Sequence, residues 1–239
     1  MRIIVVTRTL NEEERIEKFC QGYPFADIVL VGDGGSTDDT VSIAKAQPRT
    51  QVRDFLTKVQ CQNGIWRNPD GAHLQFLFDW AVEEGADWII SQDCDQRPNK
   101  LLKLDIKDIL SKSDKDFILV NQVFRWGESE YFPNMSKPNT SDWYLGLWAW
   151  RASIGLKVKD AMPHYYFNLD GSTTIFLFDQ ENRNQRLFPP YCFMHFGWIS
   201  PEQTQAHVDY YRKSGLISGM LHPLEFCGKP APLEEWMVE

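Results

Sequence analysis

The stretch Gly32-Asp33-Gly34-Gly35-Ser36-Thr37-Asp38-Asp39-Thr40 is the most informative part of this chain for the fold. It follows an apolar run over residues 27–31, which predicts a strand, and it precedes a helical pattern over residues 41–46. Its glycines allow the backbone to approach a ligand closely. Ser36 is expected to cap the helix, with Asp39 three residues further on. A strand that leads through an acidic, glycine-rich turn into a helix is typical of a place that holds a nucleotide.

This turn is neither of the two common phosphate-binding loops. It lacks the Gly-Lys-Ser/Thr of a P-loop, and Thr37 stands where the G-x-G-x-x-G pattern needs its third glycine. The carboxylate of Asp33 is an acceptor suited to a base or a ribose rather than to a phosphate. An ordinary strand–turn–helix connection is the alternative interpretation.

A second acidic turn, Asp93-Cys94-Asp95, follows residues 86–92, which predict a buried strand. In open α/β sheets, ligands bind beyond the carboxyl ends of the strands, so both acidic turns are expected to face one crevice. Two carboxylates one residue apart can share a hard divalent cation that bridges to substrate phosphates. A solvated acidic turn is the alternative, and the first turn favours the metal site. Pro98 is expected to open the next helix.

Size and charge restrict the class of protein. The 239 residues allow one large domain with a substantial core, or a domain with a small appendage. The fractions of 43% hydrophobic and 24% charged residues are typical of a soluble globular protein. A net charge of −8 and a pI near 5.2 weigh against a nucleic-acid-binding surface, although they leave room for a local basic patch. The acidic surface of this protein would also repel a nucleoside diphosphate, and a bound metal ion would remove that repulsion.

The five cysteines predict no disulfide framework. They are odd in number, widely scattered and without a C-x-x-C pair, so reduced thiols in a cytoplasmic protein are expected. The sequence starts directly with a strand pattern over residues 2–7, so no signal peptide is expected. No apolar run approaches the roughly 18–20 residues of a membrane span. We therefore expect a soluble, cytoplasmic protein without a transmembrane segment.

Strand and helix patterns alternate in the first half of the chain. A short helix is expected to begin at Asn11, which would cap it. Alternation of this kind implies a parallel sheet with helices on both faces. The other predicted elements are strands at residues 2–8, 27–32, 51–55, 87–92 and 116–124 and helices at residues 38–46, 71–84 and 99–111.

The second half of the chain predicts a less regular structure. Residues 124–150 are rich in aromatic side chains, and residues 126–142 predict a loop rich in Pro, Asn, Ser and Gly. Long irregular loops in compact domains are often lids or binding loops. Aromatic rings can stack on the apolar face of a sugar, but most of these are expected to lie in the core.

Three motifs together resemble the family 2 glycosyltransferases of the GT-A fold, which transfer a sugar from a nucleotide donor. They are Thr9-Leu10-Asn11-Glu12-Glu13, Val31 to Thr40, and Asp93-Cys94-Asp95, in the family's order and spacing over residues 3–100. A weaker likeness continues at residues 150–152, 155–158, 162–164 and 195–198.

The resemblance implies a GT-A fold, that is, an α/β protein with a Rossmann-like, mostly parallel sheet, helices on both faces and an irregular, aromatic-rich C-terminal half. Without an internal repeat or a clear linker, one domain over residues 1–239 is expected. Residues 1–97 would form its nucleotide-sugar-binding half and residues 98–239 its acceptor-binding half.

The resemblance also implies the residues of the donor site. The residues expected to line the nucleotide-sugar pocket are Thr7, Arg8, Thr9, Asn11, Asp33, Gly34, Asp93 and Cys94. Among them, Asp33 would accept a hydrogen bond from the base. The implied metal ligands are Asp93, Asp95 and His195, a set that suits Mn²⁺ or Mg²⁺, with the imidazole favouring manganese. A structural histidine beside aromatic side chains is the alternative for His195.

The sequence departs from the family at the expected catalytic base. Relatives carry a glutamate after the histidine of a "VHE" motif, where this chain has Tyr165 after His164. An inverting transferase needs a base near the acceptor hydroxyl, and the candidates are Asp170 and His164. Asp170 precedes Gly171, so a plain turn is its alternative. A retaining mechanism would need no such base.

We therefore expect a metal-dependent glycosyltransferase that uses a nucleotide-sugar donor, most simply a UDP-sugar. Its acceptor could be a glycan, a protein, a small molecule or a modified nucleic-acid base. A nucleotidyltransferase is the nearest alternative, although residues 8–11 lack the glycines of its phosphate loop. A non-catalytic sugar- or nucleotide-binding module is the alternative from another class, and the acidic residues in both turns argue against it.

Overall fold

The computed structural model describes residues 1–60, 66–132, 145–160, 165–168, 181–197, 200, 205, 209, 229–235 and 237. Its helices are α1 (Ile16–Gln21), α2 (Thr40–Ala46), α3 (Asp70–Glu83) and α4 (Lys100–Lys112), with short 3-10 helices at Ala152–Ile154 and Glu181–Arg183. Its strands are β1 (Ile3–Thr9), β2 (Ile28–Asp33), β3 (Thr50–Asp54), β4 (Val59–Gln60), β5 (Trp66–Arg67), β6 (Trp88–Ser91), β7 (Gln96–Pro98), β8 (Phe117–Trp126), β9 (Glu130–Tyr131), β10 (Leu145–Arg151), β11 (Lys157–Asp160), β12 (Tyr165–Asn168), β13 (Asn184–His195) and β14 (Ala231–Pro232).

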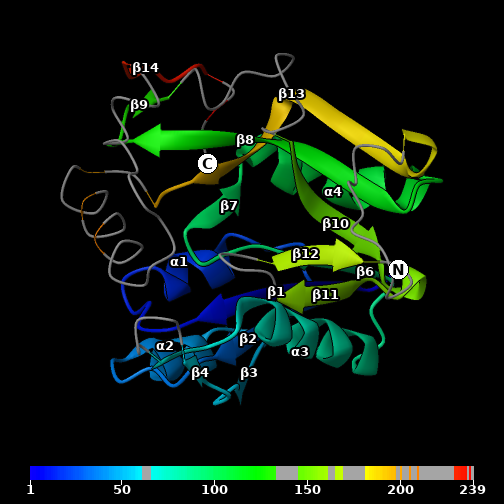
Figure 1. Ribbon diagram of the computed structural model, residues 1–239. Helices are drawn as coiled ribbons and strands as arrows, with labels where there is room; N and C mark the ends of the chain where they lie inside the picture. Colours follow the sequence, from blue (N-terminus) through cyan, green and yellow to red (C-terminus); the bar gives the residue numbers. More distant parts are fainter. Residues whose placement is uncertain are drawn as a thin grey trace.

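One central sheet organises the molecule (Figure 1). Its strand order is β14-β9-β8-β10-β6-β1-β2-β3, and β13 joins it through β8 and β7. β3, β2, β1 and β6 run parallel, whereas β10 lies antiparallel between β6 and β8. This mixed α/β architecture with a mostly parallel central sheet confirms the predicted fold class.

The register of the parallel strands places their carboxyl ends together. Thr9 of β1 lies opposite Asp33 of β2, and Val6 of β1 lies opposite Ser91 of β6. The turn after β2 and the turn after β6 therefore flank the end of β1.

Both faces of the sheet are covered, which explains why β1 and β2 are apolar without alternation. Ile3 and Val5 pack into one core cluster with residues of α1, α2 and α4. Ile4 and Val6 point to the other face and pack with residues of α3. The β11–β12 hairpin lies beside α3 on that face (Figure 1). The predicted helices on both faces are confirmed.

The aromatic region is mostly core where the structure describes it. Trp148 and Trp150 of β10 and Phe132 are each at most 1% exposed. The predicted loop over residues 126–142 includes the short strand β9. Residues 133–144 lie outside the described residues. Within the part of the chain described, no helix combines the length and apolar character that a membrane crossing needs.

The prediction that Pro98 opens α4 is wrong. Pro98 is the last residue of β7 rather than the first of the helix. Asn99 caps α4, because its side chain accepts a hydrogen bond from the backbone N of Leu102 at 3.0 Å. An asparagine side chain satisfies a free helical N–H, which a proline ring cannot do.

The predicted caps of α1 and α2 are also wrong. α2 begins at Thr40, directly after Asp39, so Ser36 lies in the preceding turn. α1 begins at Ile16, and Asn11 lies outside it with a left-handed backbone of φ 56°. Asn11 and Ser36 are hydrogen-bonded to each other instead, because the backbone N of Asn11 donates to Ser36 Oγ at 2.9 Å.

Candidate active site

Arg8, at the carboxyl end of β1, joins the second acidic turn to α3. Its Nη1 lies 3.0 Å from Asp70 Oδ1, and its Nη2 lies 2.9 Å from Asp93 Oδ1. Burial raises the pKa of the Asp93 carboxyl, whereas Arg8 and, to a smaller extent, His195 lower it. The lowering effects are larger, so the pKa of Asp93 lies below its ordinary value. Asp93 is therefore ionised at neutral pH, and Arg8 balances much of its charge.

The carboxylate of Asp33 is buried among hydrogen-bond donors of its own neighbourhood. Its Oδ2 accepts from the backbone N of Gly35 at 2.9 Å and of Ser36 at 2.8 Å. Its Oδ1 accepts from the hydroxyls of Ser36 at 2.5 Å and Thr9 at 3.1 Å. Since a carboxylate has about four lone-pair positions, a base can bind here only by replacing one of these donors. The contact of Asp33 with a base stays a prediction.

Asn11 ties the loop after β1 to the turn after β2. Its Oδ1 accepts a hydrogen bond from the backbone N of Thr37 at 2.9 Å, in addition to the bond between its own N–H and Ser36. Asparagine tolerates the left-handed conformation that this arrangement requires. The side chain of Asn11 thus holds the first acidic turn in shape.

Gly34 has no room for a side chain. A Cβ at this position would lie 2.7 Å from Asn68 Oδ1. The carbonyl O of Gly34 accepts a hydrogen bond from Lys58 Nζ at 2.6 Å, and Lys58 also donates to Asn68 Oδ1 at 2.7 Å. Lys58 therefore places a positive charge against the first acidic turn. The sequence gives no signal for Lys58 and Asn68, because they lie in a polar stretch without a motif.

Thr7 and Cys94 lie beneath the two turns. Thr7 is 0% exposed and Cys94 is 2% exposed, and the hydroxyl of Thr7 lies 3.7 Å from Cys94 Sγ. Burial raises the pKa of the Cys94 thiol well above its ordinary value, so the thiol is neutral. These two residues support the turns from the core.

β13 brings His195 to Asp95. It pairs antiparallel with β7, with His195 opposite Gln96, and His195 Nε2 lies 3.7 Å from Asp95 Oδ2. The Oδ1 of Asp95 is buried, and no described residue donates a hydrogen bond to it. Leaving a buried carboxylate oxygen without a partner is costly, and a bound cation would satisfy it.

The absence of a side chain at Gly197 leaves room for Asp95 and His195. A Cβ at Gly197 would lie 2.5 Å from Asp95 Oδ2 and 2.6 Å from His195 Cε1. The backbone N of Gly197 donates to His195 Nδ1 at 3.3 Å. This hydrogen bond occupies Nδ1, and Nε2 is the ring nitrogen that lies near Asp95.

Glu12 and Arg15 lie beside the second acidic turn. The sequence motifs give neither side chain a role in the site. Arg15 Nη1 lies 2.9 Å from Glu12 Oε2. Burial raises the pKa of Glu12, and the neighbouring Asp95 and Asp93 raise it further against the opposing effect of Arg15. A run of glutamates is the ordinary signal of a helix start, so only the fold reveals this position.

His73, on α3, supports the first turn from behind. Its Nε2 lies 2.9 Å from the carbonyl O of Gly32, and its ring stacks on Phe55 with centroids 4.3 Å apart. Burial, together with the charge of Arg8, lowers the pKa of His73 to about 4. The imidazole is therefore neutral at pH 7 and donates its Nε2–H to Gly32. No motif in the sequence marks this histidine.

Two predicted residues cannot be placed. His164 and Asp170 lie outside the described residues, so their roles stay predictions. Among the described residues, no three or more His, Cys, Asp and Glu side chains gather closely enough to hold a metal by themselves. Asp93, Asp95 and His195 thus share one edge of the sheet without forming a complete set of ligands.

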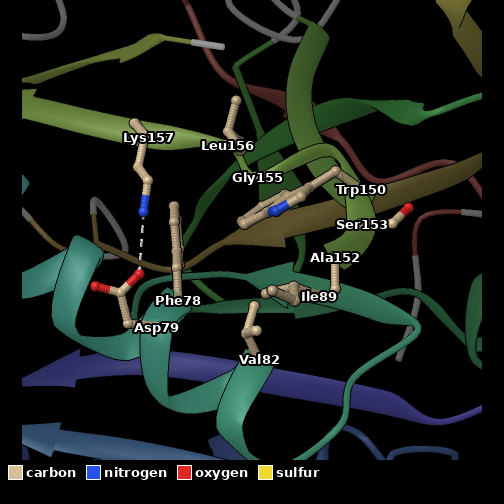
Figure 2. A pocket seen from close by; sticks show the side chains of 10 residues that line it. All are labelled: Phe78, Asp79, Val82, Ile89, Trp150, Ala152, Ser153, Gly155, Leu156 and Lys157. Carbon is tan, nitrogen blue, oxygen red and sulfur yellow. Dashed lines mark hydrogen bonds and ion pairs between the residues drawn. The ribbon is translucent and has the colours of Figure 1, made fainter. Parts of the chain in front are cut away.

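A separate cavity of about 320 Å³ lies between α3 and β10 (Figure 2). Its floor is formed by the buried side chains of Phe78, Ile89 and Trp150. At its rim Lys157 Nζ lies 3.4 Å from Asp79 Oδ1. None of the predicted site residues lines it, so the acidic turns remain the candidate active site.

The fold is that of the GT-A glycosyltransferases. The S. aureus protein TarS is similar with a TM-score of 0.55 over 89% of this chain and 38% of TarS, at 15% sequence identity. TarS 1–349, crystallised with UDP-GlcNAc, gives 0.53 over 93% of this chain and 68% of that chain, at 16% identity. The crystal structure of a mycobacterial protein gives 0.50 over 91% of this chain and 76% of that chain, at 16% identity.

Relatives by sequence include two uncharacterised proteins, one from Mycobacterium tuberculosis and one from Mycobacterium bovis. Each is 24% identical over 226 residues, which cover 88% of this chain and 50% of the relative. The chain thus spans about half the length of the curated relatives it matches. No model of a known protein family matches it. The similarities establish the fold, and the activity has to be argued from the site.

We predict that Asp33→Ala lowers the stability of the protein as well as its affinity for UDP. The substitution removes the acceptor of the hydrogen bonds from Gly35, Ser36 and Thr9. Leaving a buried donor unsatisfied costs about 1–3 kcal/mol. Urea unfolding measures the first effect and calorimetry the second. An Asp33→Ala protein with unchanged stability and unchanged UDP affinity would contradict both expected roles of Asp33.

We predict that the stability of the protein falls between pH 6.5 and pH 4 because of His73. In this range the unfolded chain binds a proton at His73, whose ordinary pKa is 6.5, whereas the folded protein does not until about pH 4. The free energy of unfolding should therefore drop by about 3 kcal/mol as the pH is lowered through this window. The charges of Arg8 and Lys58 oppose protonation and that of Asp33 favours it.

The measurement is urea unfolding of the natural protein and of His73→Gln across this pH range. Glutamine keeps a neutral donor near Gly32 and has no proton to gain, so its loss of stability should be smaller by about the same 3 kcal/mol. Equal losses in the two proteins would show that His73 is not the group responsible.

Proposed function

We propose that this chain is a metal-dependent glycosyltransferase that moves a sugar from a nucleotide-sugar, most simply a UDP-sugar, to an acceptor still to be identified. The observation that carries the proposal is the meeting of Arg8, Asp33 and the Asp93-Cys94-Asp95 turn at the ends of three neighbouring parallel strands. Ligands of open α/β sheets bind at that place. TarS structures of the same fold contain UDP-GlcNAc and UDP, which supports a UDP-sugar as the donor.

The residues at this edge fit a divalent cation. The buried Oδ1 of Asp95 receives no hydrogen bond from any described residue, and carboxylate oxygens suit Mg²⁺ and Mn²⁺. Asp95 would hold the ion, with His195 and Asp93 as the other candidate ligands. Because Arg8 balances the charge of Asp93, we expect Asp95 to contribute most. When bound, the ion would neutralise charge on the departing diphosphate.

The chain's own cations would bind the diphosphate from the protein side. Arg8 is 18% exposed at the end of β1, and Lys58 lies against Gly34 in the first turn. Both are held by hydrogen bonds or ion pairs, so they would be in place before charge develops on the leaving group. Electrostatic preorganisation of this kind is usually the largest contribution to catalysis. The glycine-rich turn would receive the nucleoside, because glycines allow the backbone to approach a ligand closely.

The first test is thermal unfolding of the protein with nucleoside diphosphates and triphosphates, with and without Mn²⁺ or Mg²⁺. A ligand that binds only the folded state raises the melting temperature, and we expect UDP with Mn²⁺ to do so. UDP-sugars should then release UDP in a reaction that EDTA stops. The proposal fails if no nucleoside diphosphate stabilises the protein.

The same experiment separates the alternatives. A nucleotidyltransferase would be stabilised by nucleoside triphosphates and would release diphosphate from them. A binding module would be stabilised by UDP without turnover. We propose Asp170 as the catalytic base and His164 as the second candidate. UDP binding and turnover of Asp170→Asn and His164→Gln decide between them, because loss of a base lowers turnover without affecting UDP binding.

A further inference from the structure

The first turn of α3 contacts both acidic turns. Asp70 and His73 are three residues apart, so their side chains leave the same face of the helix. Asp70 reaches Arg8, which also holds Asp93 of the second turn. His73 reaches Gly32, the residue before Asp33 in the first turn. One helical turn is therefore linked to both parts of the proposed donor site.

The link through His73 is rigid. The imidazole is 3% exposed, lies 2.9 Å from the carbonyl O of Gly32, and stacks on Phe55 with an interplanar angle of 12°. A Cβ at Gly32 would lie 2.8 Å from His73 Nε2, so the backbone and the ring are packed without spare room. A displacement of His73 must therefore move the strand end that carries Asp33.

The link through Asp70 is electrostatic. One guanidinium, that of Arg8, lies between the carboxylates of Asp70 and Asp93, at 3.0 Å and 2.9 Å. The three groups together carry one net negative charge. A diphosphate that approaches Arg8 therefore meets a cation whose charge is already more than balanced, and Asp70 accounts for one of the two opposing charges.

We propose that the first turn of α3 sets the two parts of the nucleotide site separately: His73 positions the turn that receives the base, and Asp70 limits the attraction of Arg8 for the diphosphate. Both are positioning residues, and the proposal rests on the proposed function. It predicts that the affinity for uridine, which has no phosphate, and the affinity for UDP respond differently to the two substitutions.

The test compares the dissociation constants of uridine and UDP, measured by ligand-observed NMR and calorimetry, in four variants. His73→Ala should weaken both ligands by the same factor, about three- to tenfold, the range expected for one lost hydrogen bond. His73→Gln should restore most of this loss, because its amide can donate to Gly32. Asp70→Asn should tighten UDP about two- to fivefold and leave uridine unchanged.

Asp79→Asn is the matched control. It removes a carboxylate from the same helix, where Asp79 pairs with Lys157, and it should change neither affinity. The inference is overturned if folded His73→Ala and His73→Gln both bind uridine as the natural protein does, or if Asp70→Asn leaves the ratio of the two affinities unchanged. If the natural protein binds neither uridine nor UDP, the proposed function itself has failed, which is a distinct result.

Discussion

Asp95→Asn is expected to abolish the metal-dependent release of UDP from a UDP-sugar while the protein remains folded. The Oδ1 of Asp95 is buried without a hydrogen-bond donor among the described residues, and His195 Nε2 lies 3.7 Å from Oδ2. An asparagine amide has no negative charge and only one oxygen, so it is a poor ligand for Mn²⁺ or Mg²⁺. The loss should reach the limit of detection, at least about 1,000-fold, because an unneutralised diphosphate is a poor leaving group.

The measurement is UDP release with Mn²⁺, with Mg²⁺ and with EDTA, together with the melting temperature in UDP with and without metal. Asp108→Asn is the control, because Asp108 is exposed on α4 and pairs only locally with Lys112 among its described ion pairs. It changes the net charge equally and should keep full activity. Full activity of the natural protein in EDTA, or a normal metal response of Asp95→Asn, would exclude Asp95 as the metal ligand.

The place of the two acidic turns could be predicted because it follows from local patterns. Residues 27–31 and 86–92 each form a short apolar run followed by an acidic turn, and helical patterns separate them. Such an alternation produces parallel strands, whose carboxyl ends share one edge of the sheet. The observed register of Thr9 with Asp33 confirms the arrangement. No long-range information was needed.

The partners of these turns depend on the tertiary structure, and the sequence offers no pattern for them. In the sequence, Asp70 looks like a polar position and His73 like an apolar position of an ordinary helix. Only the packing of α3 on the sheet brings Asp70 to Arg8 and His73 to Gly32. The insertion of β10 between β6 and β8 is likewise a long-range event. β10 runs antiparallel to β6 and to β8. Strand–helix alternation alone could not indicate this change of strand direction.

The wrong predicted caps of α1 and α2 have one physical cause. Asparagine and serine side chains cap helices, but they form equally good hydrogen bonds with nearby turns. In this protein the loop after β1 and the turn after β2 are adjacent, so Asn11 bonds to Thr37 and Ser36 bonds to Asp33. A cap pattern in the sequence is therefore weakest where two turns meet.

Gly197→Ala is expected to lower metal-dependent turnover by about 100-fold, the effect of a displacement of about 1 Å at a catalytic group. The added Cβ would lie 2.5 Å from Asp95 Oδ2 and 2.6 Å from His195 Cε1, distances that two non-bonded atoms cannot keep. One of the two side chains has to move, and each is only 14% exposed, so there is little free space for it. A displacement of Asp95 would also move its Oδ1, the oxygen proposed to hold the metal.

The required measurements are UDP release as a function of Mn²⁺ concentration and the affinity for uridine. A displaced Asp95 should raise the Mn²⁺ concentration needed for half-maximal activity, whereas uridine should bind as before because the first turn is untouched. Gly155→Ala is the control for a general effect of alanine, since Gly155 has φ 63° and a Cβ added there would meet no described atom within 4 Å. That variant should lose stability through backbone strain and keep its metal response. If Gly197→Ala behaves as Gly155→Ala does, with lower stability and a normal response to Mn²⁺, the close contact of Asp95 and His195 has no part in holding the metal.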